Sequence, residues 1–96
     1  MPRPQATATV QVDNERGRVT EWRFAPGQAT GWHRHELDYV IVPVAAGTLL
    51  LDEGETAHES ELEPGRAYYR TAGVEHDVVN AGDTEVVFVE VELKQG

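Results

Sequence analysis

The chain has 96 residues, of which 40% are hydrophobic and 26% are charged, and its formal net charge is −9. This length predicts one domain, residues 1–96, with a single hydrophobic core. The negative charge argues against nucleic acid or an anionic membrane surface as a partner, because both would repel the chain. The sequence contains no cysteine, which excludes disulfides, thiolate metal sites and a cysteine nucleophile.

The N-terminal residues lack the apolar segment of a secretory signal, and no apolar run is long enough to span a bilayer. We therefore expect a cytoplasmic protein. Residues 1–5 contain two prolines and are expected to form a flexible end.

Short segments rich in β-branched residues recur along the chain and are separated by glycine, proline and asparagine or aspartate turns. The expected strands are residues 6–13, 18–25, 29–34, 39–44, 48–52, 55–63, 67–70, 76–80 and 85–93. No segment shows a helical period with caps. About nine short strands at regular spacing predict an all-β sandwich or barrel.

Several of these strands have apolar residues whose positions predict burial. Trp22 and Phe24 lie on one face of their strand and are expected to be core residues rather than part of a ligand site. Residues 39–44 are apolar on both faces, as in a strand buried on both sides. Pro43 cannot donate to a β-ladder, so it marks an edge, a bulge or the strand end.

The last strand carries alternating valines on one face and adds Val86 and Phe88 on the face that we assign to the exterior. A homodimer interface would explain apolar residues there, and so would an internal second layer. We expect a homodimer. The acidic segment 53–63 is expected to be a solvated surface.

Three of the four histidines suggest a metal site. His33 and His35 are two residues apart, so on a strand both side chains point to one face. His76 lies in a later segment bounded by turns, and a neighbouring strand could bring it beside the first two. Three imidazoles would hold one divalent transition metal, with Fe, Zn, Ni and Mn all compatible. His58 lies among acidic residues and is expected at the surface.

The spacing around the first pair resembles a motif of the cupin superfamily. That motif has a glycine, five residues, His-x-His and a closing glycine. Gly27, His33, His35 and Gly47 fit this pattern in its longer version.

A second cupin motif follows at the usual distance along the chain. Gly65, Gly73, His76 and Asn80 match its positions, and only its proline is replaced, by Thr71. Two motifs in order make the resemblance specific. It implies a double-stranded β-helix, also called a jelly-roll β-barrel, that binds a small-molecule ligand.

The cupin family usually adds a glutamate ligand to its histidines, and here the chain departs from the pattern. The corresponding position is Val40, or Tyr39 in the shorter version. Asp38 is a candidate fourth ligand only if a bulge near Pro43 shifts the strand register, because a slip of one residue reverses the side chain. The simpler interpretation is a site of three histidines.

Three functions are compatible with this sequence. A three-histidine site is similar to those of thiol dioxygenases and of a dioxygenase that cleaves β-diketones, which implies a metalloenzyme acting on a small polar substrate. Tyr39 or Arg70 would then orient the substrate. The alternatives are a non-catalytic module that binds a small ligand and a structural or partner-binding β-domain without metal. Small acidic cupins also resemble proteins associated with amino-acid catabolism.

Each metal-binding imidazole needs a partner for its second ring nitrogen. The candidates for this supporting role are Asp38, Tyr39, Asp77 and Asn80.

Overall fold

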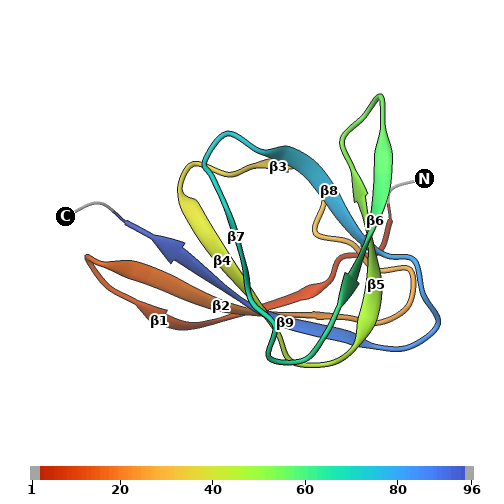
Figure 1. Cartoon of the computed structure of the whole chain (residues 1–96), viewed down its shortest axis with the longest axis horizontal. Helices are drawn as coiled ribbons and strands as arrows, with labels where there is room; N and C mark the ends of the chain where they lie inside the picture. Colours follow the sequence, from red (N-terminus) through yellow and green to blue (C-terminus); the bar gives the residue numbers. More distant parts are fainter. Residues whose placement is uncertain (1–2, 95–96) are drawn as a thin grey trace.

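The computed structural model describes residues 3–94, which form nine β-strands and no helix (Figure 1). The strands are β1 (Thr7–Asp13), β2 (Gly17–Phe24), β3 (His33–Arg34), β4 (Asp38–Pro43), β5 (Gly47–Asp52), β6 (Ala57–Leu62), β7 (Tyr68–Arg70), β8 (Glu75–Asn80) and β9 (Val86–Leu93). One sheet has the order β1-β2-β9-β4-β7 and the other β3-β8-β5-β6. The prediction of an all-β fold is confirmed.

Both sheets join strands that are distant in sequence. The last strand, β9, lies between β2 and β4 and pairs antiparallel with both. The chain crosses from one sheet to the other between β4 and β5, and Gly47 is the first residue of β5. A Cβ atom at Gly47 would lie 2.5 Å from Cγ2 of the buried Val86, so the two sheets approach too closely there for any side chain.

The hydrophobic core lies between the two sheets. Phe24, Leu49 and Val86 are almost completely buried, and the rings of Phe24 and Phe88 lie 5.5 Å apart. Burial of each such side chain contributes about 1.5–3 kcal/mol. Val86 and Phe88 therefore belong to an internal layer, so the face first assigned to the exterior is the inner one, and the second of the two explanations for these residues is confirmed. Trp22 packs against this core, as expected.

Two strand predictions need correction. Within the predicted strand 29–34 only His33–Arg34 is a strand, and Ala29 makes isolated bridges instead. In β4, Tyr39 and Ile41 are buried but the alternate residues are only partly buried, so the strand is not covered on both faces. One face of its sheet packs on the core, and Val40 and Val42 on the opposite face are only partly buried.

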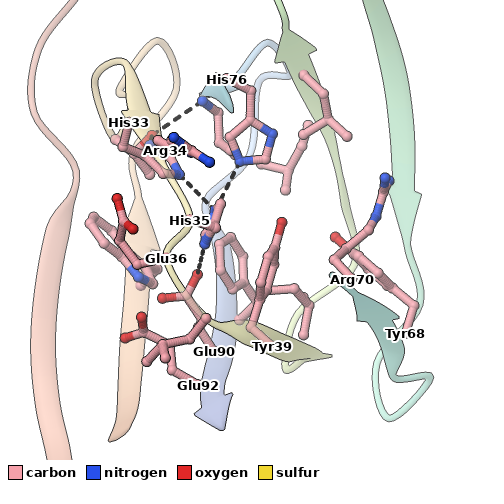
Figure 2. Close-up of a pocket in the computed structure, with 18 of the residues that line it drawn as sticks. His33, Arg34, His35, Glu36, Tyr39, Tyr68, Arg70, His76, Glu90 and Glu92 are labelled. Carbon is pink, nitrogen blue, oxygen red and sulfur yellow. Dashed lines mark hydrogen bonds and ion pairs between the residues drawn. The ribbon is translucent and has the colours of Figure 1, made fainter. Parts of the chain in front are cut away.

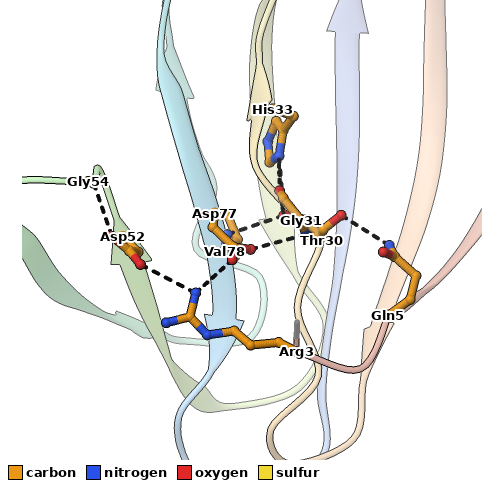
Figure 3. A network of polar contacts seen from close by, with 9 residues as sticks. All are labelled: Arg3, Gln5, Thr30, Gly31, His33, Asp52, Gly54, Asp77 and Val78. Atoms are coloured by element: carbon orange, nitrogen blue, oxygen red, sulfur yellow. Dashed lines mark hydrogen bonds and ion pairs between the residues drawn. The ribbon is translucent and has the colours of Figure 1, made fainter. Parts of the chain in front are cut away.

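The start of the described chain is hydrogen-bonded to the body of the protein. The amide of Ala29 donates to the carbonyl of Pro4 at 2.8 Å, and the Arg3 guanidinium lies 2.7 Å from the Asp77 carboxylate (Figure 3). Residues 3–5 thus contact the body of the protein, residues 1–2 lie outside the described part, and the flexibility of this end stays a prediction. No helix long and apolar enough to cross a membrane occurs in residues 3–94.

Candidate metal centre

The three histidines of the two sequence motifs lie together at one end of a pocket (Figure 2). The Nε2 atoms of His33 and His35 are 2.9 Å apart, and those of His35 and His76 are 3.1 Å apart. One potential ligand atom from each residue lies within 4.8 Å of the others. His58 lies apart from this cluster, exposed as expected and 3.7 Å from Glu53.

Strand pairing explains how His33 and His76, 43 positions apart in the sequence, come together. In the antiparallel pair β3–β8, His33 lies directly opposite His76, so the two side chains share one face. His35 follows β3 immediately, and its backbone is held by the turn before β8. Its amide donates to the carbonyl of Val74, and its carbonyl accepts from the amide of Gly73, both at 2.8 Å.

The ring of His33 is oriented through its second nitrogen. Its Nδ1 donates to the Gly31 carbonyl at 2.9 Å, which leaves a lone pair on Nε2, the atom that faces the other histidines. The Gly31 amide in turn donates to Asp77 at 3.0 Å, and Asp77 is paired with Arg3 (Figure 3). Asp77 therefore supports the cluster indirectly, as one of the four predicted supporting residues.

Asn80, a second predicted supporting residue, has a different role. Its buried side-chain amide donates to the carbonyls of Phe24 and Thr84 and accepts from the Gly82 amide. These bonds close the turn between β8 and β9. Asn80 therefore stabilises a loop of the barrel rather than a histidine ring.

Burial favours the neutral form of two of the clustered imidazoles, those of His35 and His76. It lowers the pKa of His35 to about 3 and that of His76 to about 4, with the neighbouring imidazoles adding to the effect. Neutral imidazole is the form that binds metal, so neither ring must lose a proton near neutral pH. At spacings of 2.9 and 3.1 Å, however, converging lone pairs repel unless a proton or cation lies between them.

A divalent transition metal fits this donor set. His33, His35 and His76 would hold the ion through their ring nitrogens, which lie within 4.8 Å of one another, and imidazole is a preferred ligand of Zn, Cu, Fe and Ni. The bound ion would supply Lewis-acid or redox chemistry beside the pocket.

Asp38, the candidate fourth ligand, is not brought to the cluster. Its carboxylate accepts hydrogen bonds from the Tyr69 hydroxyl and from the Ala72 amide. The pairing of β4 with β9 is regular from Asp38 to Pro43, so no bulge shifts the register there. Because Tyr39 points into the pocket, the preceding residue points away from it.

The pocket beside the histidines has a volume of about 430 Å³ and a mostly apolar wall. Both predicted substrate-orienting residues, Tyr39 and Arg70, line it, and they lie opposite each other on β4 and β7. The Tyr39 ring stacks on His35 at 3.9 Å, and burial raises the pKa of its hydroxyl to about 12. That hydroxyl therefore remains a hydrogen-bond donor.

Arg70 differs in its contacts from Arg18, another arginine that lines the pocket. Its guanidinium lies over the Tyr68 ring, 5.7 Å from the centroid, and makes no ion pair within residues 3–94. Arg18 also lines the pocket, but it is paired with Glu92 at 3.4 Å. Arg70 is thus a pocket cation that no carboxylate of the described chain neutralises, as is Arg34, which also lines the pocket but is exposed.

One site residue was missed by the sequence analysis. The Glu90 carboxylate lies 4.0 Å from Nδ1 of His35, and its side chain is only 13% exposed. Burial, with the charge of Glu92 beside it, raises the pKa of Glu90 to about 7. The alternation of side chains along β9 could have identified this residue. Glu90 is two residues after Phe88 and so lies on the same face of the strand, which is the inner face of the sheet.

Comparison with other proteins gives relatives that match nearly the whole chain. A β-alanine degradation protein, BauB, of Pseudomonas aeruginosa is 61% identical over 92 residues, covering 96% of this chain and 97% of the relative. A crystal structure of a cupin domain from Bordetella pertussis is 58% identical and superimposes with a TM-score of 0.94, covering 99% of both chains.

More distant structures share the fold. A cupin superfamily protein from Desulfitobacterium hafniense is 13% identical and has a TM-score of 0.74, covering 99% of this chain and 83% of that one. The cupin domain family matches residues 20–92. The two sheets are therefore those of the cupin jelly roll, and the chain belongs to the cupin family.

Proposed function

We propose that the protein is a metal-binding cupin in which His33, His35 and His76 hold one divalent transition metal. The observation that carries this proposal is the convergence of three imidazoles, with Nε2 separations of 2.9 and 3.1 Å, at the end of a pocket. When bound, such a metal supplies Lewis-acid or redox chemistry to a ligand that enters its open side.

The ligand that we propose is a small carboxylate with a second polar group. Arg70 offers a planar fork for the carboxylate, and the Tyr39 hydroxyl offers a further donor. The name of the Pseudomonas relative points to β-alanine, a 3-amino carboxylate, and transamination, in which a 2-oxo acid accepts the amino group and is reduced, converts it to a 3-oxo carboxylate. Both compounds carry two donor groups spaced to chelate one metal ion.

The metal would decide the reaction class. Iron would make a dioxygenase or another oxygen-dependent enzyme, whereas Zn, Ni or Mn would favour Lewis-acid chemistry. The alternative proposal is a cupin that binds the same ligand without turnover, and the cluster's lack of a carboxylate ligand within residues 3–94 favours it. Turnover assays on the loaded protein separate the two.

Elemental analysis of the purified protein, made without a histidine tag, tests the proposal. We expect about one transition metal per chain. The element found would select between oxygen-dependent and Lewis-acid chemistry. A protein that holds no Fe, Zn, Ni or Mn even after anaerobic reconstitution would contradict the proposal.

Changing Arg70 to methionine is expected to weaken binding of small carboxylates by at least about 10-fold, because a charge-assisted bidentate contact is lost. The measurement is calorimetric titration of the metal-loaded protein with β-alanine, 3-hydroxypropanoate and malonate. The matched control is Arg66→Met, because Arg66 is an exposed surface residue paired with Glu63.

An uncharged amide analogue of each ligand should bind both variants and the unaltered protein equally weakly. If Arg70→Met and Arg66→Met bind the carboxylates as tightly as the unaltered protein, Arg70 does not anchor the ligand.

We also propose a homodimer, through a different surface from the one first considered. On the outer face of the five-stranded sheet, apolar residues pair in register across every strand. This row consists of Val12, Val19, Val91, Val40 and Tyr69. Val12 is 46% exposed and Tyr69 54% exposed, so a second copy would cover apolar surface.

Sedimentation of the protein and of Val91→Glu tests this, with dissociation expected in the variant.

A further inference from the structure

We propose that Glu90 is a positioning residue for the metal centre, whose carboxylate accepts the Nδ1–H of His35 and so presents Nε2 of that ring to the metal. This inference rests on the proposed metal site of three histidines. It adds a residue of β9 to a centre otherwise built from β3, β8 and the turns around them.

The orientation of the His35 ring leaves one direction for its second nitrogen. Its Nε2 faces the Nε2 atoms of both other histidines, so Nδ1 points away from the cluster (Figure 2). Tyr39 fixes the ring plane, because the two rings stack with an interplanar angle of 16°. Within residues 3–94, the polar side chain placed beside His35 Nδ1 is that of Glu90, at 4.0 Å.

This separation is longer than a hydrogen bond. Charge-assisted N–H···O bonds are about 2.7–2.9 Å long, so the carboxylate must move about 1 Å toward the ring. A glutamate side chain has three rotatable torsions and can make this movement without a change in β9. Trp22, on the neighbouring strand β2, lines the same pocket from the inner face of the sheet.

The contrast with His33 shows why a side chain is needed. His33 donates to a backbone carbonyl, that of Gly31, which any sequence would supply. No backbone carbonyl is within hydrogen-bond distance of His35 Nδ1 in the described chain. Metal-binding histidines almost always donate their second N–H to a carboxylate, carbonyl or water, and Glu90 is the carboxylate in place to accept it.

Burial of Glu90 also points to a role beyond stability. The Glu90 side chain is only 13% exposed. Burying an ionised carboxylate to this extent costs free energy of folding unless a cation lies nearby. Within residues 3–94, Glu90 forms no ion pair with lysine or arginine. The basic side chain within 4.0 Å of its carboxylate is that of His35. A metal on the far side of that ring would provide the missing positive charge.

The test compares three variants of the full chain by their affinity for Zn²⁺ alone, measured by competition with a chromogenic chelator. Glu90→Met removes the acceptor and is expected to weaken Zn²⁺ binding by about 10–100-fold. Glu90→Gln keeps an amide oxygen as acceptor and should lose clearly less. Glu85→Gln is the matched control, because Glu85 is an exposed carboxylate just before β9 that is paired with Arg23 and lies outside the pocket. It should bind Zn²⁺ like the unaltered protein.

A second readout does not depend on metal. Ring ¹⁵N chemical shifts of His35 should report a larger fraction of the Nδ1–H tautomer in the metal-free unaltered protein than in metal-free Glu90→Met, because the Glu90 carboxylate competes with the neighbouring imidazoles for that proton. Unfolding of metal-free Glu90→Met should occur at no lower denaturant concentration than in the unaltered protein, which shows that the fold survives.

The proposal is overturned if Glu90→Met keeps both the Zn²⁺ affinity and the His35 tautomer of the unaltered protein. It is also overturned if Glu90→Gln and Glu90→Met lose the same affinity, because charge and not hydrogen bonding would then be responsible. If the unaltered protein binds no metal, the proposed function fails, while the tautomer measurement still decides whether Glu90 holds His35.

Discussion

Replacing His76 by alanine is expected to abolish metal binding, with a loss of affinity of more than about 100-fold. Mutation of a residue that only hydrogen-bonds a metal ligand typically lowers metal affinity by about 10–100-fold. The His76 variant removes a ligand itself, so a larger loss is expected. His76 is the one histidine of the cluster that comes from β8, so the variant leaves two ligands from a single short segment. The measurement is metal content per chain, by elemental analysis, after dialysis of the untagged protein.

The matched control for this prediction is His58→Ala. His58 is 50% exposed by its side chain, lies on the acidic strand β6 and should not affect metal content. Thermal unfolding provides a check on folding, because added metal should raise the unfolding temperature of the unaltered protein and of His58→Ala only. A folded His76→Ala protein that keeps one metal per chain would show that the ion binds elsewhere.

The metal-free protein is expected to lose stability when the pH falls below about 6. The pKa values of His35 and His76 are lowered from 6.5 to about 3 and about 4, so the unfolded chain takes up protons before the folded chain does. Each histidine therefore favours unfolding progressively as the pH falls through 6.5 toward its folded value.

Glu90 acts in the opposite direction. Its pKa is raised from 4.5 to about 7, so its ionised form destabilises the folded state above pH 7, and this cost disappears as the pH falls to 4.5. Two histidines outweigh one glutamate. At 1.36 kcal/mol for each pH unit that separates folded and unfolded pKa values, the net loss between pH 7 and pH 4 is about 3 kcal/mol.

Denaturant unfolding of the chelator-treated protein at pH 8, 7, 6, 5 and 4 measures this dependence. Glu90→Gln is the informative variant, because it removes the opposing contribution. It should be more stable than the unaltered protein above pH 7, by about 3 kcal/mol, and should lose this advantage by pH 4.5. A stability that rises steadily from pH 6 to pH 4 in the unaltered protein would contradict the assignment of neutral, buried histidines.

Local sequence rules were enough to predict much of this molecule. The all-β fold and most of the strands follow from alternation and from glycine and proline turns, which depend on neighbouring residues only. The grouping of His33 and His35 follows from strand geometry, and the two spaced motifs pointed to His76 as their partner. The structure brings these three side chains together.

The sequence by itself thus determined the strands, their turns and the three histidines, because each depends on short-range periodicity or spacing. Only the tertiary structure decided which face of β9 is the interior, since both faces of that strand begin with apolar residues. Pairing with β2 and β4 sets the register in which Phe88 faces the core. The same register carries Glu90 toward His35, while the regular register of β4 keeps Asp38 away from the histidines.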